Sequence, residues 1–227
     1  MIIQRYRYLI WAMVAAIAVA FGLAWGIAAT KRDFFPYNIV KMVWGDAGLD
    51  AHVRSARRDL MEIQDKYGRP NSTVIVGDSI MAAVPWHEIL PDVTVRAVGG
   101  ATSADVLARL PKLSTLPSKR SVLMIGVNDV LAGEAPEAIA DRVEQIVTGL
   151  PGRVTLMGVW PCNSKFPRCA SYLPTIAALN SKLAAKVGER VTYVPPPPSV
   201  AEHLTYDGLH LRLAGMEMLV EHVLRTL

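Results

Sequence analysis

Four short polar clusters carry the residue types that nucleophilic acyl transfer requires. They are Gly77-Asp78-Ser79-Ile80, Gly99-Gly100-Ala101-Thr102, Gly126-Val127-Asn128-Asp129 and Asp207-Gly208-Leu209-His210. Together they supply a hydroxyl, an imidazole, carboxylates, a side-chain amide and flexible backbone N–H groups. Such a set can form a covalent acyl intermediate and stabilise the negative charge that develops beside it.

Ser79, His210 and Asp207 fit the three roles of a catalytic triad. A serine hydroxyl is a weak nucleophile until a neighbouring base takes its proton. Histidine is suited to that task because it titrates near neutrality. A carboxylate must then fix the imidazole tautomer and stabilise the imidazolium. Asp207 and His210 lie three residues apart, so one loop can supply both.

The oxyanion of the tetrahedral intermediate needs hydrogen-bond donors of its own. Gly100 can offer a backbone N–H with no side chain in the way, Asn128 its amide, and Ser79 its own N–H. We expect these three residues to form the oxyanion hole. Asp78 is expected to support the turn around Ser79, and Asp129 to cap a helix or hold its loop.

Each cluster also has an ordinary structural explanation. Asp-Gly pairs are common turns, adjacent glycines allow a tight turn after a strand, and Asn128 or Asp129 is suited to cap a helix. A phosphate-binding loop is excluded at Gly77, because no Lys follows in the P-loop pattern. The order and placement of all four clusters favour catalysis.

Strands and helices alternate in the part of the chain that holds these clusters. Short apolar, β-branched runs predict strands at 73–76, 93–98, 122–125, 154–158 and 191–194. Helices are predicted at 102–110, 135–149, 172–187 and 212–226. This alternation indicates an α/β domain with a five-stranded parallel sheet covered on both faces. Ligands of such sheets bind beyond the carboxyl ends of the strands, where the first three clusters lie.

With these four clusters, the sequence resembles the SGNH (GDSL-type) hydrolases over roughly residues 72–227. The resemblance rests on the four clusters, which match the family's nucleophile, glycine, G-x-N-D and D-x-x-H blocks in order. It departs from the family pattern at Ile80, where Leu is usual, at Ala97, often Gly, and at Ala101, often acidic. The resemblance implies a flavodoxin-like three-layer fold and ester hydrolysis without a metal or other cofactor.

The first thirty residues predict a membrane anchor. Tyr8 to Thr30 is an uncharged, largely apolar run of 23 residues, and about 20 helical residues span a bilayer core. Trp11 and Trp25 lie near its ends, where aromatic rings prefer the interface. The alternative is a cleaved signal peptide, although the apolar region of such peptides is usually about 7–15 residues.

The catalytic part is expected outside the cytoplasm, because a short N-terminal tail and the anchor precede a large C-terminal domain. Cys162 and Cys169 lie in one Pro-rich loop and would close a small disulfide ring there. The alternative is two reduced thiols.

The sequence therefore predicts three parts of the chain. Residues 1–30 form the anchor, residues 31–71 a juxtamembrane segment and residues 72–227 the hydrolase domain.

An amphipathic helix of about 19 residues is predicted to end the juxtamembrane segment. Its apolar stripe consists of Leu49, Val53, Ala56, Leu60, Ile63 and Tyr67. Gly68 and Pro70 end the pattern. We expect the stripe to pack on the domain or to act as a membrane spacer. A dimer seam is the less favoured alternative, because the stripe is short for a coiled coil.

Composition and net charge exclude some classes of protein and of binding partner. The chain has 227 residues, 52% apolar, 19% charged, with a net charge of +4. This composition excludes a disordered chain, and the scattered charges do not indicate a nucleic-acid partner.

The predicted function is that of a membrane-anchored serine esterase acting on cell-envelope glycan, lipid or small acyl esters. An O-acyltransferase acting on an extracytoplasmic polysaccharide is the alternative, and a tethered binding protein with a dead site is a third. The oligomeric state is not predicted.

Overall fold

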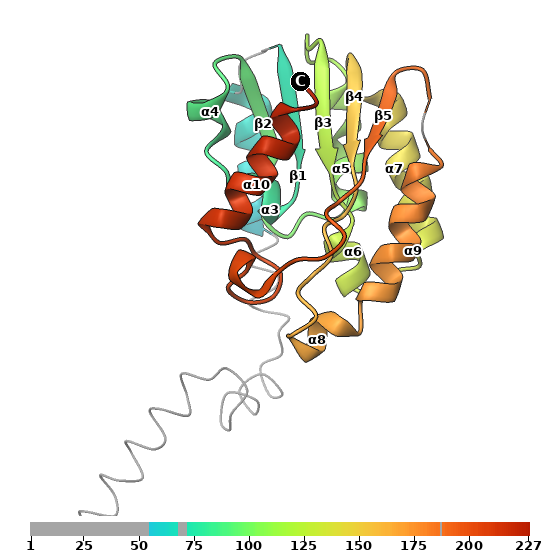
Figure 1. Ribbon diagram of the computed structural model, residues 1–227. Coiled ribbons are helices and arrows are strands. Elements are labelled where there is room, and N and C mark those ends of the chain that lie inside the picture. The colour runs from blue at the N-terminus through green and yellow to red at the C-terminus, as the bar shows by residue number, and fades with distance from the viewer. Residues whose placement is uncertain (1–54, 68–71, 187) are drawn as a thin grey trace, which may run out of the picture. The chain divides into compact units, whose positions relative to one another are not determined.

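The computed structural model describes residues 55–67, 72–186 and 188–227 (Figure 1). One compact unit of the chain runs from Arg57 to Leu227 and contains all four polar clusters. It therefore includes part of a helix that precedes residue 72. The predicted membrane anchor lies outside the described residues. Within those residues, no helix is both long and apolar enough to cross a bilayer.

A five-stranded sheet forms the centre of this unit, and every strand pair in it is parallel. The strands are β1 (Thr73–Gly77), β2 (Val93–Ala97), β3 (Arg120–Met124), β4 (Arg153–Met157) and β5 (Val191–Val194). Their order is β2-β1-β3-β4-β5, the flavodoxin-like arrangement. All five residues of β1 are buried, as expected for a strand covered on both faces. The predicted parallel α/β sheet is confirmed.

Helices cover both faces of the sheet. The longer ones are α5 (Ser103–Leu113), α7 (Pro136–Gly149), α9 (Leu173–Ala184) and α10 (Leu213–Leu224). In Figure 1, α10 lies in front of the sheet and α5 and α7 lie behind it; α9 packs against α7. Shorter elements are α3 (Ser79–Ala82), α4 (Trp86–Ile89), α6 (Val127–Leu131), α8 (Pro167–Ala170) and the 3₁₀ turn η1 (Glu202–Leu204). The four predicted helices are confirmed, with shifted ends.

The helix at residues 55–67 packs with a different face from the one that the sequence predicts. Leu60, Ile63 and Tyr67 are 45%, 56% and 69% exposed. The contacts with the domain come instead from buried Met61 and from Asp65, which pairs with Arg96 and Arg109 at 3.5 and 3.3 Å. The expected packing of the apolar stripe is therefore wrong for these residues, because ion pairs dock the opposite face. A membrane-spacer role stays a prediction.

The two cysteines are adjacent but reduced in the structure. Cys162 and Cys169 are buried, free thiols. The Cys162 thiol donates to the carbonyl of Cys169 at 3.2 Å, and the Cys169 thiol to the carbonyl of Gly208 at 3.4 Å. Burial and the neighbouring thiol raise the pKa of Cys162 to about 12. The structure thus contains the thiol alternative, and the disulfide stays a prediction for the oxidised protein.

Candidate active site

The nucleophile candidate lies where β1 turns into α3. Gly77 ends the strand, and a Cβ added there would lie 2.6 Å from Cγ of Met81 and 2.7 Å from the carbonyl oxygen of Met124. Only glycine therefore fits this turn. Asp78 is the N-cap of α3, where its Oδ1 accepts from the N–H of Ile80 at 2.9 Å. Ser79 follows as the first helical residue, so its own N–H has no acceptor within the helix.

Asp78 is buried beneath this turn. Complete burial raises its pKa to about 7, although the N–H of Ile80 and the nearby His210 both act to lower it. Near neutrality the carboxyl group is therefore partly protonated. Its bond from the N–H of Ile80 is the contact expected of a residue that supports the turn, and that role stays a prediction.

Ser79, His210 and Asp207 form one hydrogen-bonded chain, although 128 residues separate Ser79 from Asp207 in the sequence. Oγ of Ser79 lies 3.0 Å from Nε2 of His210. Nδ1 of the same ring lies 2.6 Å from Oδ2 of Asp207. A carboxylate only accepts, so Nδ1 carries the ring proton and Nε2 of the neutral ring is left to accept from the serine hydroxyl.

The loop of Asp207 and His210 is held mainly by its own backbone. Oδ1 of Asp207 accepts from the N–H groups of Leu209 and His210 at 2.9 and 2.7 Å. Partial burial acts to raise the pKa of Asp207, but the bonds from the ring and backbone of His210 and from Leu209 outweigh it, and the pKa is lowered. Asp207 therefore stays ionised beside the imidazole.

Three further contacts fix this loop. Thr205 and Leu211 form an antiparallel bridge across it. The N–H of Asn163 donates to the carbonyl of Gly208 at 2.7 Å. The exposed ring of Tyr206 stacks on the imidazole of His210, with centroids 5.8 Å apart and planes inclined by 15°. The Tyr206 contact was not predicted, because nothing in the spacing of the D-x-x-H block indicates a stacking partner.

The glycine block lies beside the serine. A Cβ added to Gly99 would lie 4.0 Å from Cβ of Ser79. Gly100 has a φ of +67°, a conformation that disfavours other residues. The amide of Asn128 donates to the carbonyl of Ala101 at 2.8 Å. Since Nδ2 carries two hydrogens, that bond leaves the second available. The predicted oxyanion donors Gly100, in the glycine block, and Asn128, in the first turn of α6, are thus linked through the carbonyl of Ala101.

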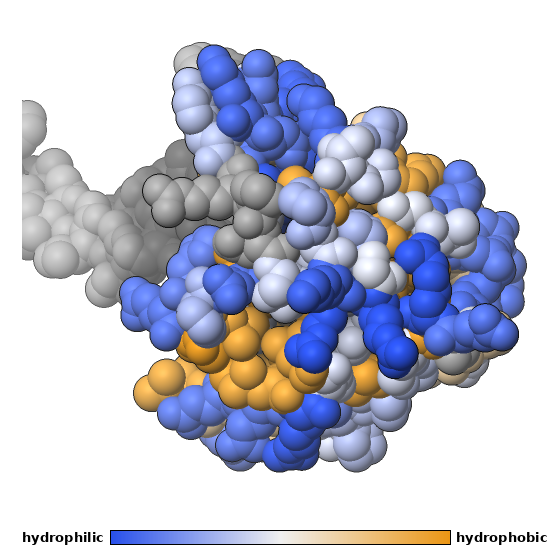
Figure 2. All heavy atoms as spheres, turned by 90° about the horizontal axis from the view of Figure 1, so that it is seen from above, coloured by the Kyte–Doolittle hydropathy of each residue, from blue (hydrophilic) through white to orange (hydrophobic). Residues whose placement is uncertain are grey.

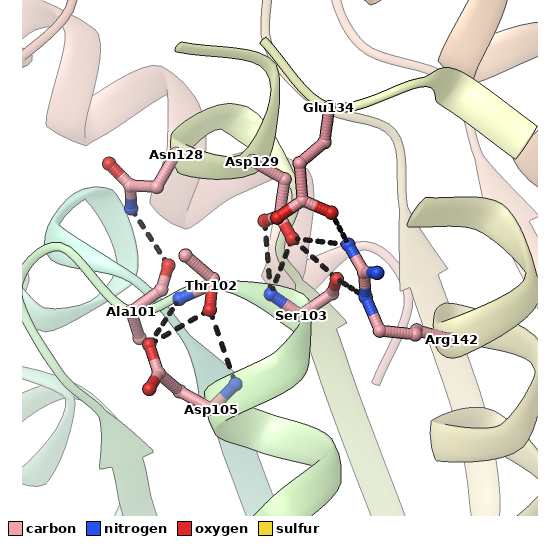
Figure 3. Close-up of polar contacts among 8 residues, drawn as sticks. All are labelled: Ala101, Thr102, Ser103, Asp105, Asn128, Asp129, Glu134 and Arg142. Atoms are coloured by element: carbon pink, nitrogen blue, oxygen red, sulfur yellow. Dashed lines mark hydrogen bonds and ion pairs between the residues drawn. The ribbon is translucent and has the colours of Figure 1, made fainter. Parts of the chain in front are cut away.

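A polar network centred on the buried side chains of Asp129 and Ser103 lies next to Asn128 and the glycine block (Figure 3). Both carboxylate oxygens of Asp129 accept from the N–H of Ser103 at 3.0 Å, and Oδ1 also accepts from its hydroxyl at 2.5 Å. Arg142 donates to Oδ1 of Asp129 at 3.1 Å and to Oγ of Ser103 at 2.7 Å. Glu134 completes the network by pairing with Arg142. Asp129 lies in α6, whose N-cap is Gly126, and it therefore links the start of α6 to the start of α5.

Sequence reasoning missed Ser103 and Arg142. Ser103 directly follows the glycine block, so its closeness to Asp129 could have been guessed once the two blocks were placed side by side. Arg142 lies on α7, thirteen residues after Asp129, and no local pattern separates it from the other charged residues of that helix.

Two surface grooves lie away from the triad. One of about 820 Å³ runs between residues 60–67 and β2, and one of about 490 Å³ between α4 and α10. Neither is lined by Ser79, Asn128 or His210. The face seen from above is largely hydrophilic, with one broad apolar patch and smaller apolar areas elsewhere (Figure 2).

Comparison with known proteins gives a family match. Residues 75–218 match the profile of the GDSL-like Lipase/Acylhydrolase family. No curated protein matches the chain in sequence. Among solved structures, one from Streptococcus pneumonia, provisionally described as a platelet activating factor, has a TM-score of 0.69 at 17% identity. That similarity covers 81% of this chain and 98% of the other.

Two further structures are similar. TesA has a TM-score of 0.55 at 25% identity, covering 68% of this chain and 96% of its own. The psychrotrophic esterase EstA from Pseudoalteromonas sp. has a TM-score of 0.52 at 15% identity, covering 68% and 96%. At identities of 15% and 17%, the likeness concerns the fold alone. The profile match spans more than half of the chain, so the protein belongs to the GDSL-like lipase/acylhydrolase (SGNH) family and is a carboxylic ester hydrolase.

Proposed function

We propose that the protein is a membrane-anchored serine esterase in which Ser79, His210 and Asp207 form the catalytic triad. The observation that carries the proposal is the hydrogen-bonded chain from Ser79 Oγ through His210 to Asp207, at 3.0 and 2.6 Å. This chain supplies a nucleophile, a base and a group that orients the base, which are the three parts that acyl transfer from an ester requires.

In the first half of the reaction, Oγ of Ser79 attacks the ester carbonyl while Nε2 of His210 takes its proton. The imidazolium that forms is stabilised by Asp207, which stays ionised because its pKa is lowered. His210 then protonates the leaving alcohol, and the acyl group remains on Ser79. In the second half, His210 accepts a proton from water, and the resulting hydroxide attacks the acyl-enzyme. The serine regains its proton as the acid leaves.

The oxyanion of both tetrahedral intermediates is stabilised by the N–H groups of Ser79 and Gly100 and by the amide of Asn128. The closeness of Gly99 to Ser79 and the bond from Asn128 to Ala101 support this assignment, because they link Ser79, the glycine block and Asn128 in one region. A donor held rigidly before the reaction needs no reorganisation in the transition state, which is why such donors contribute strongly.

The predicted anchor makes esters at or near a membrane the preferred substrates: cell-envelope glycan esters, lipid esters or small acyl esters. The catalytic domain would then lie outside the cytoplasm. The same acyl-enzyme can be resolved by a sugar hydroxyl in place of water, which makes an O-acyltransferase the alternative. Product analysis with an added acceptor sugar distinguishes the two.

The test uses the full-length chain in detergent, with p-nitrophenyl esters of short and medium acyl chains and a fluorophosphonate probe. Ser79→Ala is the test variant. Ser181→Ala is the matched control, because Ser181 is an exposed serine whose hydroxyl donates to the carbonyl of Ala177 within α9. We expect hydrolysis and labelling in the wild type and in the control, and loss of both in Ser79→Ala.

Labelling without hydrolysis would favour the transferase, and acylated sugar would then appear when the acceptor is added. Wild-type turnover in the Ser79→Ala variant would contradict the assignment of the nucleophile. Neither labelling nor turnover in a folded wild-type protein would contradict the triad itself and favour a tethered binding protein.

A further inference from the structure

The side chain of Arg57 contacts Gly100 of the proposed oxyanion loop. Arg57 itself belongs to the helix at residues 55–67, which precedes the four polar clusters. A Cβ added to Gly100 would lie 2.6 Å from Nη2 of Arg57 and 3.3 Å from its Cζ. The guanidinium thus occupies the space that a side chain at position 100 would need. Its side chain is only 17% exposed, so this position is a packed one.

One carboxylate ties Arg57 to the loop. Nη1 of Arg57 lies 3.4 Å from Oδ2 of Asp105. The same oxygen accepts from the backbone N–H and the hydroxyl of Thr102, each at 2.9 Å. Thr102 is the N-cap of α5 and ends the glycine block. Arg57 and the end of the oxyanion loop are therefore fastened to a single atom.

The helix that carries Arg57 is itself firmly docked. Asp65 pairs with Arg96 of β2 and Arg109 of α5, and all three of these side chains are almost fully buried. This second attachment, two turns beyond Arg57, fixes the helix against the same α5 that begins at the glycine block. The helix is thus attached to the domain at two points, through Arg57 and through Asp65.

We propose that Arg57 is a positioning residue for the oxyanion hole. Its guanidinium packs over Gly100, keeps that residue in the φ +67° conformation and places a permanent positive charge beside the site of the oxyanion. An arginine stays charged at every accessible pH. Nε of Arg57 is buried and has no hydrogen-bond partner among the residues that the structure describes, so Asp105 engages only part of the guanidinium. This inference rests on the proposed function of Gly100.

The experiment compares four variants of the full-length chain: Arg57→Met, Arg57→Lys, Arg58→Met and Ser79→Ala. Arg58 is the matched control, since it is an exposed arginine on the same helix. The readouts are kcat and KM for a p-nitrophenyl ester, with kcat referred to active sites titrated by the fluorophosphonate. The rate constant of phosphonylation is also measured, because the phosphoryl oxygen of that probe occupies the oxyanion hole.

Arg57→Met is expected to lower kcat and the phosphonylation rate about 10-fold to 100-fold, with KM within about threefold, because a transition-state interaction is lost. Arg57→Lys should recover at least a third of wild-type kcat, since it restores the charge. Arg58→Met should match the wild type.

Three results would overturn the inference. The first is a kcat for Arg57→Met within twofold of wild type. The second is an Arg57→Lys variant no better than Arg57→Met, which would leave no part for the charge. The third is a loss of folded protein with unchanged kcat per titrated site, which would make Arg57 purely structural. Failure of the proposed function is distinguishable from all three, because it would appear as activity retained in Ser79→Ala.

Discussion

The two halves of the site are built in different ways. The proposed oxyanion half is held by Asp129, whose side chain is 0% exposed and which binds Ser103 and Arg142 across three elements of the fold. The other half is the proposed acid–base loop, in which the side chains of Asp207 and His210 are 42% and 35% exposed. Within the part of the chain that the structure describes, the carboxylate of Asp207 bonds only to groups of Leu209 and His210.

This difference separates stability from catalysis. A buried carboxylate with several partners cannot be removed without leaving those partners unsatisfied, so its loss is felt by the whole fold. When an exposed carboxylate is removed, its former partners can form hydrogen bonds with water. The substitution is therefore expected to lower the reaction rate much more than the free energy of unfolding. Two aspartates in one site are thus expected to respond in opposite ways to the same substitution.

The largest effects should come from that pair of substitutions. Asp207→Asn is expected to lower kcat about 10⁴-fold, because the imidazole loses its orienting charge and tautomer, with a free energy of unfolding within about 1 kcal/mol of wild type. Asp129→Asn is expected to lower the free energy of unfolding by about 3 kcal/mol, because Arg142 loses its buried partner. Ester hydrolysis and urea denaturation check the two values.

Asp141→Asn serves as the control for both, since Asp141 is an exposed carboxylate whose ion pair with Lys186 at 3.4 Å is solvated. Surface pairs of this kind contribute about 0–1 kcal/mol, so neither property should change. Equal losses of stability in Asp207→Asn and Asp129→Asn would contradict the division between the halves.

Asp78 gives the next largest effect, as a dependence of stability on pH. Its pKa is about 7 in the folded protein against 3.8 in the unfolded chain. Between these values the folded state holds the proton more tightly, so stability falls as pH rises from about 4 to 7 and is level above. At about 1.4 kcal/mol per pH unit, the fall is about 4 kcal/mol.

Asp78→Asn should remove this slope, because an amide can still accept from the N–H of Ile80 but does not ionise. Urea denaturation of the wild type and the variant at intervals from about pH 4 to 9 measures this slope, and Asp141→Asn should keep the wild-type slope. A wild-type slope in Asp78→Asn would mean that another group causes it.

Asn128→Ala tests a residue expected to contribute both to catalysis, as an oxyanion donor, and to stability, through its bond to Ala101. Loss of one oxyanion donor is expected to lower kcat about 10²-fold to 10³-fold. The lost bond to the carbonyl of Ala101 should cost about 1 kcal/mol of unfolding free energy. Asn128→Asp is the comparison variant: it keeps the size of the side chain but replaces the donor with a charge. It should therefore lose at least as much activity as Asn128→Ala.

The sequence predicts the parts of the site that are local in the chain, and it misses the parts that are not. The blocks around Ser79, Asn128 and His210 were predicted because each follows a strand or forms a short loop, where spacing alone carries information. Arg57 and Arg142 were missed because their partners are 48 and 13 residues away. Only the packing of separate helices brings them to the loops.

The helix at residues 55–67 shows the same limit for the fold. Periodicity correctly predicted a helix there, but it assigned the apolar stripe to the interface. The ion pairs of Asp65 with Arg96 and Arg109 decide which face packs, and they depend on a strand and a helix that lie later in the chain. A hydrophobic pattern shows where an apolar face lies, and the partners available determine whether that face is the one covered.

Substitution of Tyr206 should give the smallest effect. It tests which contacts hold His210 in the exposed loop. Its ring stacks on His210 at 5.8 Å, and such contacts contribute about 0.5–1.5 kcal/mol. Tyr206→Leu is expected to lower kcat/KM about threefold, because the imidazole is held less firmly, whereas Tyr206→Phe keeps the ring and should match the wild type. An equal loss in both variants would assign the effect to the hydroxyl. The exposed half would then depend on a polar contact, as the buried half does.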